Sequence, residues 1–75
     1  MGIRRERLFE CSCQAGIEAV RLTFRARSPE EAVQDLEDVL ARTGIQAHGD
    51  VIVRDARGRE VLRAPSPRQG AAGAA

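Results

Sequence analysis

One segment of the chain, "RSPEEAVQDLEDVLARTG", contains every signal of a complete helix and limits the folds open to a sequence of 75 residues. Ser28 is a favoured N-cap, Pro29 suits the first helical turn, and Glu31 completes a capping box. Gly44 supplies the left-handed residue that ends many helices. The apolar residues between these signals recur at helical spacing, so the sequence predicts one amphipathic helix over 29–43. The apolar stripe consists of Ala32, Val33, Leu36, Val39 and Leu40.

Two strands are predicted before this helix, because apolar and polar residues alternate there. The first strand covers 7–13 and places Phe9, Cys11 and Cys13 on one side. The second covers 19–27, and "QAG" at 14–16 supplies the turn between them. In the second strand Val20, Leu22, Phe24 and Ala26 point one way, whereas Arg21, Thr23, Arg25 and Arg27 point the other.

A hairpin is predicted after the helix, following a loop at 45–50. Its strands cover 51–54 and 59–63, and "DARG" between them fits a type I turn that ends on a glycine in a G1 bulge. This turn sets the strand register. We expect Val53 opposite Val61, Ile52 opposite Leu62, and Arg54 opposite Glu60 as a cross-strand ion pair.

The predicted fold class is therefore α+β: a small single-layer ββαββ domain with one helix on one face of the sheet. The four strands are mainly antiparallel, and connection rules favour the order 2-1-3-4, counting strands along the chain. We expect the domain to cover residues 6–64, after a flexible basic arm at 1–5 and before a disordered tail at 65–75. A core of this size is near the lower limit for independent folding, which favours oligomerisation as a source of added stability.

The face of the sheet on which the two cysteines lie depends on the length of the loop that joins the first two strands. A loop with an even number of residues pairs Cys13 with Glu18, Cys11 with Val20 and Phe9 with Leu22, and it places both thiols beneath the helix. A three-residue loop pairs Cys13 with Ile17 instead and turns these side chains to the opposite face. Burial of Phe9 favours the even loop. We therefore expect the cysteines to pack as small apolar residues, with metal or redox roles as the less favoured alternatives.

The sequence favours a non-enzymatic protein. His48 lies on a predicted loop without a serine in a nucleophile context, and the chain contains no phosphate-binding loop motif. We predict no catalytic residue, no cofactor, no metal site and no small-molecule substrate, because so short a chain encloses little volume. There is no apolar run of 18 residues and no signal-peptide pattern, so a soluble, cytoplasmic protein without a membrane partner is expected.

The uncovered face of the sheet is the predicted partner surface. The favoured interpretation is a protein-interaction or assembly module, acting as a homodimer or binding a protein partner through this open face or an edge strand. The alternative is nucleic-acid binding through an arginine-rich sheet face and the N-terminal arm, although no aromatic residue is expected there to stack bases. A domain without a specific partner on this face, including an unrecognised small enzyme, is the third possibility. The candidate residues are Arg21, Thr23, Arg25, Arg27, Ile52, Arg54 and Leu62.

Charge does not decide between these interpretations. The net charge is +1, so no overall attraction to nucleic acid or to an anionic membrane is expected. All twelve basic residues are arginine. The simplest reason is codon bias in a GC-rich genome, and the alternative is selection for the bidentate contacts that a guanidinium makes.

Overall fold

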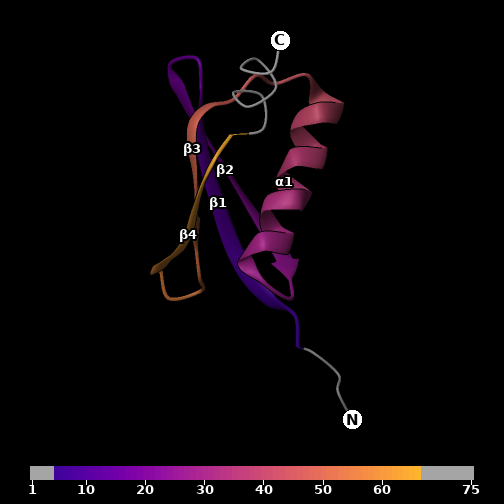
Figure 1. Cartoon of the computed structure of the whole chain (residues 1–75), viewed down its shortest axis with the longest axis vertical. Helices are drawn as coiled ribbons and strands as arrows, with labels where there is room; N and C mark the ends of the chain where they lie inside the picture. Colours follow the sequence, from indigo (N-terminus) through magenta and orange to yellow (C-terminus); the bar gives the residue numbers. More distant parts are fainter. Residues whose placement is uncertain (1–4, 67–75) are drawn as a thin grey trace.

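Four strands and one helix make up residues 5–66, the part of the chain that this computed structural model describes (Figure 1). The strands form one antiparallel sheet in the order β2-β1-β3-β4, and α1 packs on one side of it. The predicted α+β fold, strand order and single helix layer are confirmed. The elements are β1 (Arg7–Ala15), β2 (Glu18–Ala26), α1 (Pro29–Thr43), β3 (His48–Arg54) and β4 (Glu60–Pro65).

The helix begins and ends at the residues that the sequence indicates. The Ser28 side chain accepts a hydrogen bond from the Glu31 N–H at 3.2 Å. The Glu31 carboxylate reaches back and accepts the Arg27 N–H at 2.9 Å, one residue before the position of a standard capping box. At the other end Gly44 adopts a φ of 75° and donates its N–H to the Leu40 carbonyl at 3.0 Å. Each end of the helix is therefore capped by hydrogen bonds to local groups.

The first hairpin has an even loop, and its two residues are Gly16 and Ile17. Gly16 has a φ of 66° and takes the first loop position, as a type II′ turn requires. Phe9 and Cys11 face the helix, which confirms the predicted side. The predicted partners were wrong by two residues, because the predicted pairing of Cys13 with Glu18 requires a loop of four residues and the loop has two. The observed pairs are Phe9–Phe24, Cys11–Leu22 and Cys13–Val20.

The second hairpin has the predicted turn. The Gly58 N–H donates to the Asp55 carbonyl and the Asp55 N–H donates to the Arg59 carbonyl, both at 2.9 Å. Gly58 has a φ of 84°, which fits the G1 bulge. The Asp55 carboxylate also accepts the backbone N–H groups of Arg57 and Arg59. These hydrogen bonds, the one from Arg59 most of all, lower the pKa of Asp55.

Beyond this turn the predicted register was wrong. Arg54 pairs with Glu60 as expected, but Val53 then pairs with Leu62 and Ile52 with Arg63. The shift leaves Val61 as an extra residue, a second bulge that we had not predicted. The cause is burial: without the shift, Arg63 would lie opposite Val51 beneath the helix, and Leu62 would face water.

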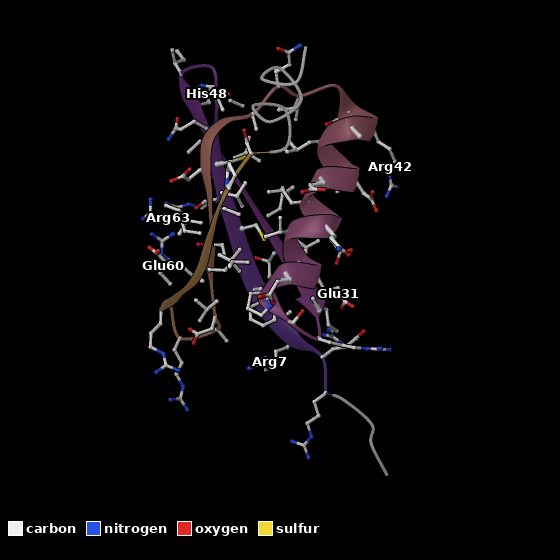
Figure 2. The ribbon with its side chains drawn as sticks, viewed as in Figure 1. Arg7, Glu31, Arg42, His48, Glu60 and Arg63 are labelled. Atoms are coloured by element: carbon white, nitrogen blue, oxygen red, sulfur yellow. The ribbon has the colours of Figure 1, made fainter. Side chains whose placement is uncertain are left out.

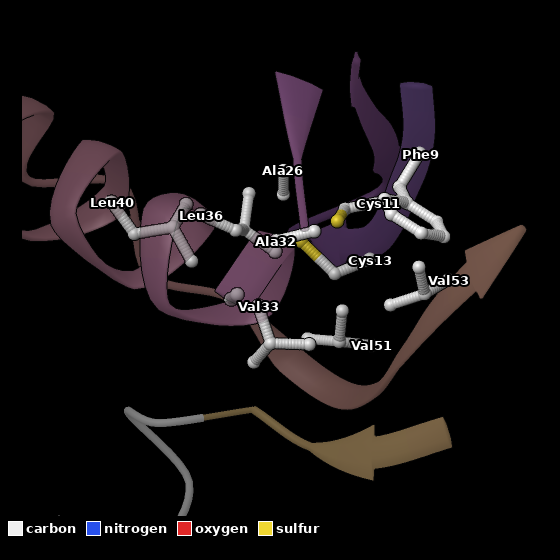
Figure 3. Close-up of a cluster of buried hydrophobic side chains, with 11 residues drawn as sticks. Phe9, Cys11, Cys13, Ala26, Ala32, Val33, Leu36, Leu40, Val51 and Val53 are labelled. Atoms are coloured by element: carbon white, nitrogen blue, oxygen red, sulfur yellow. The ribbon is translucent and has the colours of Figure 1, made fainter. Parts of the chain in front are cut away.

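The core lies between the sheet and the helix (Figure 3). Phe9, Cys11 and Leu36 are each at most 1% exposed, and the sulfur atoms of both cysteines lie among aliphatic side chains. The predicted packing role of the cysteines is confirmed. The Arg7 guanidinium lies 5.1 Å from the centre of the Phe9 ring, at the end of this layer. The other buried apolar residues are Cys13, Ala26, Ala32, Val33, Leu40, Ala47, Val51 and Val53.

The folded domain extends two residues beyond the predicted boundary at Ala64. Pro65 is the last residue of β4. Ser66 is 1% exposed, and its hydroxyl donates to the Ala47 carbonyl while its N–H donates to the Gly49 carbonyl. The rest of the predicted tail, 67–75, and residues 1–4 of the predicted arm lie outside the described residues. Within residues 5–66 no helix has the length and apolar character needed to span a membrane.

Candidate partner-binding surface

The sheet face opposite the helix is a set of cross-strand rows, because directly paired residues point to the same side. Leu8, Glu10, Ser12 and Gln14 of β1 run along its middle, between the candidates on β2 and those on β3. The three rows nearest the centre are Arg25–Leu8, Thr23–Glu10–Arg54–Glu60 and Arg21–Ser12–Ile52–Arg63. We call this surface the open face.

Five of the seven candidate residues meet on the open face: Arg21, Thr23, Arg25, Ile52 and Arg54. The other two do not. Arg27 lies beyond the end of β2, exposed in the connection to α1. Leu62 packs partly buried against the core, opposite Val53, because the bulge at Val61 turns it towards the helix. Its placement on the open face was therefore wrong.

Arg63 lies opposite Ile52 on the open face, where Leu62 was predicted. Its guanidinium pairs with Glu60 at 3.1 Å and with Asp50 at 3.6 Å, on the side of β4 away from the helix (Figure 2). The hydrogen bond from Arg63 is the main cause of the lowered pKa of Glu60. The positive charge of Arg54 also lowers this pKa, by a smaller amount. The predicted Arg54–Glu60 ion pair is replaced by Arg63–Glu60, since no Arg54–Glu60 contact within 4.0 Å is present in residues 5–66.

Residues of the open face that were missed include Ser12, Asp50 and Arg63. Ser12 follows directly from the alternation along β1, and its hydroxyl donates to the Ile52 carbonyl at 3.4 Å. The position of Arg63 on the open face depends on the bulge at Val61, which was not predicted. The signal was available, since an arginine predicted to lie opposite the buried Val51 indicates a register that must shift.

The open face has shallow hollows rather than a deep pocket. One of about 300 Å³ lies between Leu8, Glu10, Thr23 and the β3–β4 turn, and another of about 230 Å³ lies beside Ser12 and Arg21. Small-molecule sites are usually enclosed cavities of roughly 300–1,000 Å³. Shallow hollows with charged rims suit contact with another protein better than they suit the enclosure of a small molecule.

The two edges of the sheet are unlike each other. β2 forms one edge with nine residues, Glu18–Ala26, and pairs with β1 in an unbroken register. β4 forms the other edge with six residues, a bulge at Val61 and a terminal proline, Pro65. Short length, bulges and proline protect an edge from pairing with another strand. β2 has none of these three features, and its edge carries only the charges of Glu18, Arg21 and Arg25.

The two thiols and His48 are the other groups of residues 5–66 that could carry chemistry. Burial raises the pKa of the Cys11 thiol to about 11, with smaller contributions from Asp35, Cys13 and Glu10, and burial also raises the pKa of Cys13. A thiol of this kind is a poor nucleophile at neutral pH. His48, which opens β3 instead of lying on a loop, contacts the Gly16 carbonyl through Nε2 at 3.2 Å. Residues 5–66 contain no group of three or more His, Cys, Asp or Glu side chains able to hold a metal ion.

Comparisons of the chain with protein-family models, with curated proteins and with solved structures found no significant match.

Proposed function

We propose that this chain is a non-enzymatic, cytoplasmic assembly module that associates with protein through its sheet, with a second copy of itself as the partner. The observation that supports this most is the β2 edge beside the open face, a nine-residue strand in unbroken register that contains no proline. Val20, Leu22 and Phe24 of β2 pack against the core but stay only partly buried. Association along this edge would remove more of their apolar surface from water, which is the main favourable term in protein association.

The composition of the open face also supports a protein partner. Glu10 and Glu60 lie on either side of Arg54, and Arg63 pairs with Glu60 and Asp50, so carboxylates accompany the arginines of this face. Arginine is enriched in protein interfaces, where its guanidinium forms bidentate contacts with carboxylates. A mixed surface of this kind favours a folded protein over a uniformly charged polymer.

Light scattering over a concentration series tests the proposal. The chain contains no Trp or Tyr, so concentration is best followed by refractive index. We expect the average mass to rise from one chain towards two at micromolar concentrations. A mass of one chain throughout the series, up to hundreds of micromolar, would overturn self-association.

A second function, nucleic-acid binding, has one observation in its favour. Arg5, Arg25 and Arg27 surround a hollow of about 410 Å³ at the end of β2 near the N-terminus, with Glu6 as the fourth lining residue. Both aromatic residues of the chain, Phe9 and Phe24, face the helix, so no stacking platform for bases supports it. Retention on mixed RNA and DNA at low salt, lost in the double variant Arg25→Gln/Arg27→Gln, would favour this function. No retention at low salt would exclude it.

A further inference from the structure

We infer that β2 pairs antiparallel with β2 of a second copy, with Leu22 on the two-fold axis, so that one continuous sheet crosses both molecules. This inference rests on the proposed function and specifies the strand, its direction and its register. Both helices then lie on the same face of the joined sheet, since a two-fold axis perpendicular to a sheet keeps its faces.

The backbone of β2 offers hydrogen-bonding groups for this pairing. In a two-residue hairpin the residues that flank the loop form a hydrogen-bonded pair, and such pairs alternate along the ladder. Ala15 and Glu18 flank the loop here, so alternate residues from Glu18 onward direct their N–H and C=O groups towards β1. The residues between them direct both groups to the free edge. These residues are Ala19, Arg21, Thr23 and Arg25.

Symmetry restricts the registers that two copies of this edge can adopt. Paired residues must share a face, so the axis has to pass through a residue pair and not between pairs. An axis at Leu22 pairs the whole of Glu18–Ala26 with itself. It places Arg21 opposite Thr23 of the second copy and Arg25 opposite Ala19. No arginine faces another arginine.

The two neighbouring registers are less favourable. An axis at Arg21 places this arginine opposite its own copy, and an axis at Thr23 places Arg21 opposite Arg25. Like charges directly across a ladder destabilise the pairing. Both registers also leave residues at one end of β2 without a partner. The sequence of β2 is therefore self-complementary in one register that uses its full length.

The side chains beside β2 add charge complementarity to this register. Thr23 lies between Glu10 on β1 and, in the pair, Arg21 of the second copy. A threonine is short enough for the long arginine side chain to reach over it to the Glu10 carboxylate. Within residues 5–66 Glu10 has no ion pair closer than 4.0 Å. On the opposite face Leu22 meets Leu22 and Val20 meets Phe24, and all three are only partly buried in the single chain.

A mixed-disulfide experiment tests this register. Arg21→Cys and Thr23→Cys are made separately in the full chain, mixed under reducing conditions and then oxidised. In the proposed register position 21 of one copy lies directly opposite position 23 of the other, at about 5.5 Å between Cα atoms, which suits a disulfide. We expect the mixed disulfide to exceed both homodisulfides, as measured by mass spectrometry. The native thiols lie on the other face and are buried, so they do not compete.

Each single variant is the control for a neighbouring register. An excess of Arg21→Cys homodisulfide would place the axis at Arg21, and an excess of Thr23→Cys homodisulfide would place it at Thr23. Either result overturns the inference. Light scattering that shows a dimer without any disulfide at these positions would overturn it too, while leaving the proposed self-association intact. A chain that is monomeric at every concentration overturns both.

Charge variants provide a second test without any cross-link. Thr23→Arg places arginine opposite Arg21 twice in each dimer, so we expect the dissociation constant to rise about tenfold at low salt. Ala19→Glu places a carboxylate opposite Arg25 twice and should lower it, with both effects fading as salt is added. All of these positions are exposed, so the fold is retained. Equal effects of the two variants would contradict the register.

Discussion

The two faces of the sheet are built from the same strands but differ in the burial and the composition of their side chains. On β1, Phe9 is 1% exposed and fills the space beneath the helix, whereas the adjacent Leu8 points the other way and is 47% exposed. The helix-covered face is an apolar layer that is buried at its centre, with Val20, Leu22, Phe24 and Leu62 packed against it and only partly buried. The open face holds exposed arginines, carboxylates and a few aliphatic groups. The contrast indicates that one face carries most of the packing that stabilises the fold and that the other contributes little to it.

The largest effect that would test this contrast comes from Phe9→Ala. Removing a fully buried phenylalanine side chain typically costs about 3–5 kcal/mol, a large part of the stability of a domain this small. Leu8→Ala is the matched control one residue away, and we expect it to change stability by less than about 0.5 kcal/mol. Urea unfolding followed by far-UV circular dichroism measures both. Similar losses in the two variants would refute the distinction between the faces.

A second, smaller effect is expected from the thiols. Cys11→Ser places a hydroxyl among apolar groups, and a buried polar group without a partner costs about 1–3 kcal/mol. Ser12→Ala, on the open face, removes only a long hydrogen bond of 3.4 Å to the Ile52 carbonyl and should cost less. The difference between the two unfolding free energies is the quantity to compare. A harmless Cys11→Ser would mean that the site tolerates polar groups.

The same thiol predicts a loss of stability at alkaline pH. Burial raises the pKa of Cys11 in the folded chain to about 11, above its ordinary value of 9.0. Its contribution is therefore fully present below about pH 9 and is lost as the pH rises towards 11. The chain has no Lys or Tyr, so few other groups titrate in this window. Urea midpoints should fall between pH 9 and 11 in the wild type and fall less in Cys11→Ala.

The bulge at Val61 in β4 determines which face of the sheet Leu62 occupies, so Leu62 and Val61 can be compared. Leu62 packs partly buried against the core, whereas the neighbouring Val61 is 41% exposed. Leu62→Ala should cost about 1–2 kcal/mol, below the range for fully buried leucines, and Val61→Ala clearly less. If Val61→Ala were the more damaging variant, the register first predicted from the sequence would be the better description.

The β3–β4 hairpin also shows how much of the fold could be predicted from the sequence and where the prediction failed. The helix ends, the strand order and the sides of β1 followed from capping residues and from alternation, which are local signals. The partners of Cys11 and of Val53 did not follow, because they depend on a loop length and a bulge that change the register without changing the pattern. On the open face, the bulge places Arg63 at the position that was predicted for Leu62.

The smallest expected effect completes the comparison, since the ion pairs of Arg63 are the only salt bridges on the open face within residues 5–66. Exposed pairs of this kind contribute little, so Arg63→Gln should leave the urea midpoint at neutral pH unchanged within error. The variant should still alter Glu60, whose pKa is lowered mainly by the hydrogen bond from Arg63. An NMR titration should show the Glu60 pKa rising towards its ordinary value. A fall in stability as large as that of Leu62→Ala would show that the open face also supports the fold, and the distinction between the two faces would no longer hold.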